Sequence, residues 1–215
     1  MTMTEGTSPR ERYRVRVRAE IKQHAWEQMA TTGMSALSLN AIAKQVGMSG
    51  PALYRYFASR DELITELVRD AYRSLADTVR AARETDADVA GLARAMRKWA
   101  LTDPHRYFLI YGTPIPGYHA PGETTEISFE IMSVLIDAHA ALSRAKPATP
   151  FDAHLDAHRH WAGDHPASSA TLHRALSFWV RIHGVLSLEL AGHFTGMGFD
   201  PALFFDDEVR GLLEN

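Results

Sequence analysis

The densest group of potential metal ligands lies between residues 152 and 160. His154 and His158 are four residues apart, a spacing that places two imidazoles on one face of a helix, where they can share a metal ion. His160, Asp152 and Asp156 complete the group. A solvated polar segment beside a linker explains the same residues, because nothing fixes the geometry of a third ligand. A helical metal-dependent enzyme therefore stays an alternative, while we predict no metal and no other cofactor.

Other catalytic signatures are absent from the sequence. It contains no cysteine, no H-E-x-x-H motif, no nucleophile elbow and no phosphate-binding loop. The lack of cysteine removes thiol nucleophiles, disulfides and cysteine-based metal sites. We therefore predict that the protein is not an enzyme.

A second set of residues could bind an organic molecule. Large rings recur after residue 99, and His183 could anchor a polar group among them. Rings at helical spacing are also typical of an ordinary core, in which His183 would be a hydrogen-bonded core histidine. A pocket built from these residues would favour a mostly apolar small molecule, because they include no cluster of charges. The candidate lining residues are Trp99, Tyr107, Tyr111, Phe129, Trp161, Trp179 and His183.

Charge is distributed unevenly along the chain. Residues 1–60 carry nine Lys and Arg against four acidic residues, a net charge of +5. The remainder carries 14 basic and 22 acidic residues, a net charge of −8, and the whole chain has −3. A basic segment on an acidic body suits binding to DNA phosphates at one end. A solvated charged helix gives the same balance, so charge alone does not assign the function.

The elements that would position these residues are all helical. Hydrophobic residues make up 46% of the chain and no run alternates as a strand would, so we predict an all-α protein. We predict two domains, residues 1–60 and 61–215. A first helix is expected to contain residues 17–29 and to end near residue 32. Further helices are expected at about 39–46, 50–56, 60–83, 86–101, from 104, 123–145, 151–161, 171–194 and 202–213, with breaks at 112–122, 146–150 and 164–169.

The segment 39–57 meets the packing demands of two short helices that cross steeply. Ala43 is small where the helices would touch, and Gly47 permits a turn with positive φ. Ser38 and Ser49 can cap the two helices. The second helix is left with small, polar and aromatic exposed residues, a surface that in a helix-turn-helix enters the major groove. An ordinary αα-corner would share the Ala-x-x-x-Gly spacing.

Three stretches resemble the DNA-binding domain of the TetR family of bacterial repressors. They are GMSALSL (33–39), IAKQVG (42–47) and SGPALYRYFASRDEL (49–63), within a run from residue 21 to 67. Gly50 departs from the family pattern, in which a side chain at this position often reads a base. The resemblance and the exposed surface of the second helix together give the candidate DNA contacts: Ser38, Asn40, Lys44, Ser49, Gly50, Pro51, Ala52, Tyr54, Arg55, Tyr56 and Arg60.

The segment FWVRIHGVLSLELAGHF, residues 178–194, resembles the C-terminal domain of a TetR subgroup named for its Trp, His and Gly. Trp179, His183 and Gly184 match that pattern. Gly184 would permit a neighbouring helix to come close. Because an almost entirely apolar helix needs cover on all sides, we predict a homodimer formed through it and the final helix. A charge placed at Leu186 or Leu190 of this interface is then expected to give a monomer or an insoluble chain.

The sequence has neither a secretory signal nor the run of about 20 apolar residues that a membrane-spanning helix needs. We therefore predict a cytoplasmic protein without a membrane partner. The resemblance implies a repressor that binds double-stranded operator DNA and is released by a small-molecule effector. A constitutive architectural DNA-binding protein without an effector is the remaining alternative.

Overall fold

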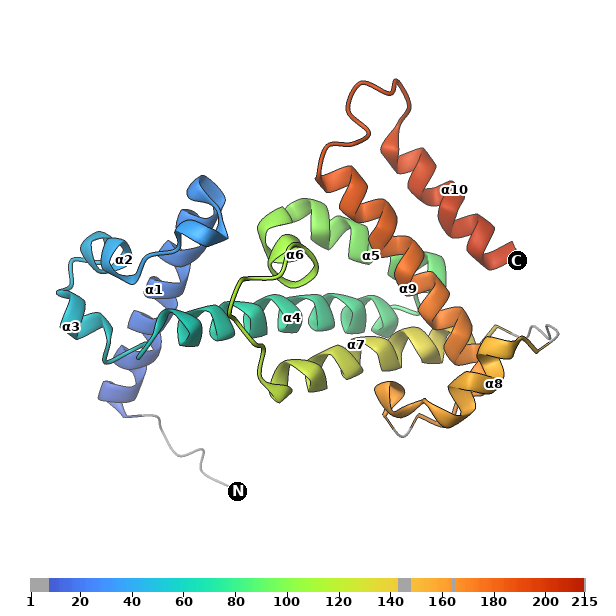
Figure 1. Ribbon diagram of the computed structural model, residues 1–215, viewed down its shortest axis with the longest axis horizontal. Coiled ribbons are helices and arrows are strands. Elements are labelled where there is room, and N and C mark those ends of the chain that lie inside the picture. The colour runs from blue at the N-terminus through green and yellow to red at the C-terminus, as the bar shows by residue number, and fades with distance from the viewer. Residues whose placement is uncertain (1–7, 143–147, 164, 215) are drawn as a thin grey trace. The chain divides into compact units, whose positions relative to one another are not determined.

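The computed structural model describes residues 8–142, 148–163 and 165–214. Within these ranges the chain forms ten α-helices and two 3-10 helices and no strand, which confirms the predicted all-α class (Figure 1). The chain divides into two compact units. The first unit extends to Val68 and includes Thr113–Ala120, and the second contains Arg69–Gly112 and the chain from Pro121 onward.

The first unit contains three helices, a 3-10 turn and the beginning of a fourth helix. Side-chain caps define where the helices begin: Ser8 accepts a hydrogen bond from the Glu11 N–H, and Ser59 accepts one from the Glu62 N–H. Buried apolar residues then close the unit, among them Ile21, which is fully buried. The elements are α1 (Pro9–Thr32), the 3-10 turn Met34–Ala36, α2 (Leu39–Gln45), α3 (Gly50–Leu53) and the start of α4 (Arg60–Glu84).

α3 is shorter than the sequence indicates, since it ends at Leu53 rather than near Tyr56. The following residues form a turn, and the Phe57 ring is fully buried. Arg18 of α1 explains the change of direction. Its guanidinium donates to the Tyr56 carbonyl and lies 4.1 Å from the centroid of the Phe57 ring. A long-range contact therefore ends a helix that local signals would have continued.

The second unit contains the remainder of α4 and six further helices around one main core. The largest fully buried side chain of this core is Tyr107, which packs with Leu92 and Phe178. A smaller cluster of Ile136, Leu155 and Leu172 packs beside it. The helices are α5 (Val89–Thr102), α6 (Pro104–Tyr111), α7 (Gly122–Ala140), α8 (Pro150–Ala157), α9 (Ser169–Leu190) and α10 (Pro201–Glu214), with a 3-10 turn at His160–Ala162.

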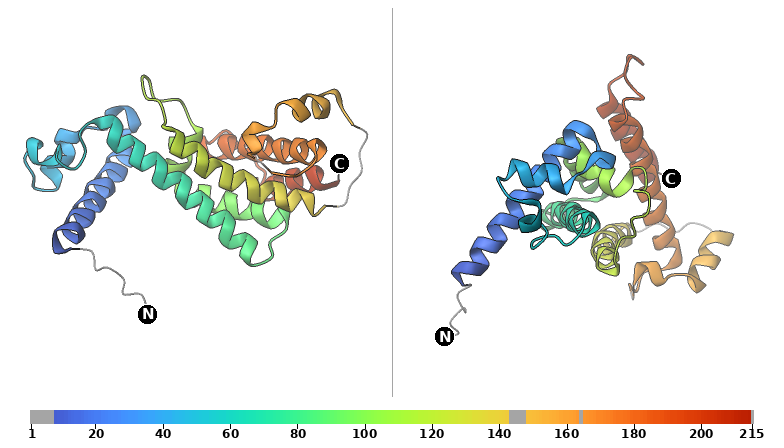
Figure 2. Two further views of the ribbon diagram at one scale, coloured as in Figure 1. Left: turned by 90° about the horizontal axis from the view of Figure 1, so that it is seen from below. Right: turned by 60° about the vertical axis from the view of Figure 1, so that its left-hand side comes forward.

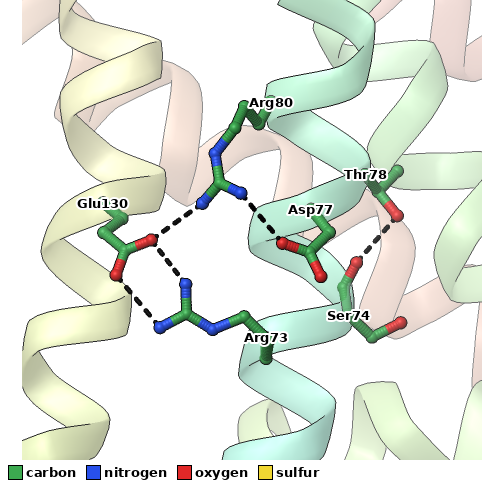
Figure 3. Close-up of polar contacts among 6 residues, drawn as sticks. All are labelled: Arg73, Ser74, Asp77, Thr78, Arg80 and Glu130. Carbon is green, nitrogen blue, oxygen red and sulfur yellow. Dashed lines mark hydrogen bonds and ion pairs between the residues drawn. The ribbon is translucent and has the colours of Figure 1, made fainter. Parts of the chain in front are cut away.

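α4 and α7 run side by side in the second unit and are joined by ion pairs (Figures 2 and 3). Glu130 of α7 accepts two hydrogen bonds from Arg73, at 2.7 and 3.1 Å, and one from Arg80, at 2.9 Å. Arg80 also donates to Asp77 at 3.0 Å. Exposed pairs contribute at most about 1 kcal/mol each, so this network orients the two helices more than it stabilises them.

Three further helix ends differ from the sequence-based prediction. α8 ends at Ala157, and Trp161 lies in the separate 3-10 turn. α9 ends at Leu190, because Gly192 adopts a φ of 79° that a helix cannot continue. α7 ends at Ala140, and the predicted end near Ala145, like the start of the predicted linker 146–150, lies outside the described residues.

The structure corrects the prediction that Leu186 and Leu190 face a partner. Leu186 is 1% exposed within the core of its own subunit, and Leu190 is half-buried against the same core. The outward side of α9 instead presents Val180 and Leu188, which are 67% and 46% exposed. Among the described residues no helix is both long and apolar enough to cross a membrane.

Candidate functional site

The turn between α2 and α3 has the geometry of a helix-turn-helix. Ala43 is almost fully buried where the helices meet, and its carbonyl accepts a hydrogen bond from the Met48 N–H at 2.8 Å. Gly47 has a φ of 68°, which glycine adopts without steric cost. The seam is closed by Ile42 and Leu53, both fully buried. Sequence reasoning located this unit correctly because its signals are local.

The structure exposes most of the candidate DNA contacts on α2, α3 and the turn that follows. Asn40, Lys44, Tyr54 and Arg55 are exposed, and the Tyr54 side chain is 47% exposed. The Asn40 side chain lies beside Gly50, the position that departs from the family pattern. A Cβ built on Gly50 would lie 3.4 Å from the Asn40 Oδ1. The Asn40 amide is therefore next to the space that a larger side chain at position 50 would enter. The remaining exposed candidates are Ser49 and Pro51, while Gly50, Ala52 and Tyr56 are half-buried.

Two of the candidate DNA contacts hold the structure around the start of α2. Ser38 caps α2 by accepting from the Ala41 N–H at 3.4 Å, and its own N–H donates to the Gln28 side chain at 2.7 Å. Arg60 donates to the carbonyl of Leu37 at 3.1 Å and to that of Met34 at 3.0 Å. These bonds fix the 3-10 turn against α4. Contacts of Ser38 and Arg60 with DNA remain predictions.

In the second unit, four of the predicted pocket residues form one ring cluster: Tyr107, Tyr111, Trp179 and His183. The His183 ring centroid lies 4.0 Å from that of Trp179 and 4.1 Å from that of Tyr111. Tyr107 stacks on His183 at 5.7 Å. These residues come from α6 and α9, which are 76 residues apart at the Tyr107–His183 contact. Trp99 joins the edge of the cluster, 6.5 Å from Tyr107.

The cluster contains two buried polar atoms without a partner. The Tyr107 hydroxyl is satisfied, since it lies 2.8 Å from the Ser187 hydroxyl and donates to the His183 carbonyl at 3.1 Å. In contrast, the His183 Nε2 and the Tyr111 hydroxyl have no hydrogen-bond partner among the described residues. A buried polar atom left unpaired costs about 1–3 kcal/mol. Because the two rings are in contact, one water molecule or one polar group of a ligand could hydrogen-bond to both atoms.

Burial controls the protonation of this cluster. Desolvation lowers the pKa of His183 to about 3, so the imidazole is neutral at physiological pH. Desolvation also raises the pKa of Tyr111 well above its ordinary value, and the neighbouring Tyr72 and Tyr107 act in the same direction. A neutral histidine and a neutral phenol suit an uncharged ligand group better than an anion.

Acid should therefore destabilise the protein through His183. The unfolded state binds a proton near pH 6.5 and the folded state only near pH 3, so this stability is present above about pH 6.5 and is lost progressively below it. Between pH 7 and pH 5 we expect a loss of about 1–2 kcal/mol from this residue. Urea denaturation at both pH values should show a smaller loss for His183→Gln than for wild type. Equal losses in both proteins would contradict a neutral buried His183.

The other two predicted pocket residues lie apart from the ring cluster. Phe129 of α7 is 36% exposed and lines a shallow groove with Glu126 and His165. Trp161 packs against the main core and the smaller cluster, and no ring contact joins it to His183 within the described ranges. A pocket of about 420 Å³ that the sequence did not predict lies among α7, α8, α9 and α10, lined by His139, Asp152, His173 and Arg181 among others.

The histidine-rich segment does not assemble as a metal site. The rings of His154 and His158 stack face to face at 4.0 Å. Asp152 accepts hydrogen bonds from Thr149 and lies 2.9 Å from the His173 Nδ1. In residues 8–142, 148–163 and 165–214, no three His, Asp or Glu side chains converge as metal ligands. Nothing in this geometry supports the metal-dependent enzyme.

Comparison with known families agrees with both units. The family of bacterial regulatory proteins of the tetR type matches residues 21–67, and the tetracyclin repressor-like C-terminal domain matches residues 89–212. The second match contains Trp179, His183 and Gly184. The resemblance noted in the sequence is thereby confirmed for the larger part of the chain.

Individual relatives give the same result. The HTH-type transcriptional regulator Rv1816 of Mycobacterium tuberculosis is 36% identical over 93% of this chain and 92% of its own length. The protein SCO4313, for which a crystal structure is known, is 68% identical and has a TM-score of 0.91, with 97% of this chain and 100% of that chain covered. A regulatory protein in the tetR family from Rhodococcus RHA1, at 16% identity and a TM-score of 0.59 over 92% of this chain and 95% of that one, shares the fold. The chain belongs to the TetR family of helix-turn-helix transcriptional regulators.

Proposed function

We propose that this regulator is a homodimeric, cytoplasmic repressor that an uncharged, mostly apolar small molecule releases from its operator. The observation that carries the proposal is the pair of unpartnered buried polar atoms, the His183 Nε2 and the Tyr111 hydroxyl, within the ring cluster. An architectural DNA-binding protein would have no need for such a pair. The functional division is residues 1–60 for operator binding and residues 61–215 for effector binding and dimerisation.

Operator binding is assigned to the exposed surface of α2 and α3. α3 enters the major groove, with Ser49, Gly50, Pro51 and Ala52 near base edges. Small residues permit a close approach there. The other proposed contacts are Ser38, Asn40, Lys44, Tyr54, Arg55, Tyr56 and Arg60, and these bind phosphates or nearby bases.

Dimerisation is assigned to the outward face of α9 together with α10. Val180, Gly184 and Leu188 follow one another at four-residue spacing, and all three are exposed. A Cβ added at Gly184 would meet nothing within 4 Å, so no helix of the same subunit approaches it. α10 adds Leu203 and Phe204, which are 69% and 36% exposed. A second copy of this apolar surface is the natural cover, because a two-fold interface pairs a patch with itself.

The effector is assigned to the ring cluster. The Tyr107 hydroxyl is hydrogen-bonded to the Ser187 hydroxyl and to the His183 carbonyl, so it holds the cluster together and is not available to a ligand. The free positions are the His183 Nε2 and the Tyr111 hydroxyl. One hydroxyl or amide group of an otherwise apolar ligand could pair with both, and the surrounding rings would select for shape and apolar area.

A route from this cluster to α4 is present in the second unit. Trp99 lies beside Tyr107, and its Nε1 donates to the Ser74 hydroxyl of α4 at 3.1 Å. α4 contributes residues to both units. A ligand that binds better to one arrangement of this contact would shift the population of α4 positions, and with it the separation of the two recognition helices in a dimer.

The test is a thermal-shift screen of neutral apolar compounds that carry one hydroxyl or amide group, followed by operator binding. A compound at 100 times its Kd should stabilise the protein by about 2.7 kcal/mol. The same compound should weaken operator binding by about 1–3 kcal/mol. Fluorescence anisotropy of a labelled operator duplex measures the second effect.

Tyr111→Phe is the informative variant in this screen. It removes one unpartnered hydroxyl, so the free protein should keep its stability while the response to the compound decreases. His173→Gln changes the separate pocket among α7 to α10 and serves as the control, with an unchanged response. A response lost in His173→Gln and retained in Tyr111→Phe would move the effector to that pocket. Compounds that raise the melting temperature without releasing DNA would show a binding site without a switch.

A further inference from the structure

α1 extends well beyond the core that it covers. Its buried residues are Val17, Ile21, Ala25 and Met29, whereas all residues from Pro9 to Arg16 are exposed. The first two turns of α1 therefore extend beyond the packed part of the first unit and bury no side chain against it. Helical turns that bury no side chain are only marginally stable by themselves. A binding partner would explain why the chain keeps this extension helical.

The exposed turns carry arginine on the side that elsewhere faces the core. Arg10 and Arg14 precede Val17 and Ile21 by seven residues, which is close to two helical turns and places each on the same side as the buried residue. The next arginine on this side, Arg18, contacts the Tyr56 carbonyl and the Phe57 ring. The side of α1 that faces the core thus carries apolar residues from Val17 onward and arginines before it. The change occurs next to Arg18, which contacts Tyr56 in the turn after α3.

This position is close to the proposed DNA surface. Tyr56 lies three residues after the end of α3, and Arg18 donates a hydrogen bond to its carbonyl. Eight residues separate Arg18 from Arg10, so the extension reaches about 12 Å further, about the width of the major groove. Figure 2 shows this N-terminal part of α1, in dark blue, projecting past α2 and α3 of the same unit.

Arg10 and Arg14 also differ from other arginines of the chain in their ion pairing. Arg18 pairs with Glu62 and Glu66, and in the second unit Arg73 and Arg97 are held by glutamates. Among the described residues, neither the Arg10 nor the Arg14 guanidinium makes an ion pair or a side-chain hydrogen bond. The only acidic residue between Pro9 and Arg16 is Glu11. Arg10 and Arg14 are therefore exposed guanidinium groups that no acidic side chain in the described part of the chain neutralises.

We propose that the extension of α1, residues 9–16, is a second DNA contact in which Arg10 and Arg14 bind backbone phosphates beside the base pairs that α3 reads. This inference rests on the proposed binding of operator DNA. Phosphate contacts fix register and add affinity without reading sequence. Each one releases counterions, so its signature is the dependence of affinity on salt.

The experiment measures the affinity of the full-length protein for an operator duplex, selected by the wild-type protein from a random-sequence pool, between 50 and 200 mM salt. Each lost phosphate contact should make the slope of log K against log salt shallower by about 0.9. The double variant Arg10→Gln/Arg14→Gln removes four contacts from a dimer, so the slope should decrease by about 3–4. The ratio of affinities for operator and scrambled duplex should stay that of wild type.

Two further variants complete the test. Arg94→Gln/Arg210→Gln removes the same charge from two exposed positions of the second unit and should leave the slope unchanged. Arg10→Lys/Arg14→Lys keeps the charge and should restore most of the slope. A slope like that of wild type in Arg10→Gln/Arg14→Gln would overturn the inference, and so would an equal decrease in Arg94→Gln/Arg210→Gln. Failure of the proposed function looks different, because wild-type protein would then select no sequence from the pool.

Discussion

Replacing Leu188 by arginine is expected to convert the proposed dimer into a monomer and to reduce operator affinity by about 100-fold or more. Leu188 lies on the exposed side of α9, in an apolar groove that also contains Val180 and Phe204. Burying a leucine is worth about 1.5–3 kcal/mol, and a two-fold interface contains each residue twice. An arginine there would have to bury an unpaired charge, which costs several kcal/mol for each copy.

Analytical ultracentrifugation gives the oligomeric state, and anisotropy with a palindromic duplex gives the affinity. Leu101→Arg is the matched control, because Leu101 is similarly exposed at 40% but lies in a groove lined by Arg94, Arg97 and Lys98. It should remain a dimer. A dimer that persists in both Leu188→Arg and Val180→Arg would place the interface elsewhere.

Replacing Tyr54 by alanine should weaken operator binding by about 1–3 kcal/mol, a decrease of roughly 5–150-fold in affinity. The side chain is 47% exposed just after α3, so its hydroxyl can reach a phosphate while the ring packs on the DNA backbone. Its exposure also means that the substitution leaves no cavity, and the variant should unfold at the same urea concentration as wild type.

Lys44→Ala should differ from Tyr54→Ala in its signature. Lys44 is exposed in the last turn of α2 and is assigned to a phosphate, so its loss should weaken binding to every sequence and make the salt dependence shallower. Lys98→Ala, an equal change of charge in α5, serves as the control. If Tyr54→Ala and Lys44→Ala both bind as tightly as wild type, the assignment of the recognition surface is wrong.

Local chemistry explains why much of the first unit could be predicted. The Ser38 cap of α2, the positive φ of Gly47 and the small Ala43 act over a few residues, so their meaning does not depend on the rest of the fold. The predicted cap at Ser49 is wrong, because its side chain makes no capping hydrogen bond at the start of α3. The early end of α3 could not be predicted in the same way. It depends on Arg18, which is 38 residues from the Tyr56 carbonyl that it holds.

In the second unit, the sequence by itself determined that the helices exist and that α9 is too apolar to stand alone. It could not tell which side of α9 faces its own core, because leucines and valines occur all around that helix and give no direction. Only tertiary packing buries Leu186 and exposes Val180 and Leu188. Packing likewise unites Tyr107 with His183 across 76 residues and leaves the His183 Nε2 unpaired. Periodicity encodes which residues share a face, whereas burial is decided by what packs against that face.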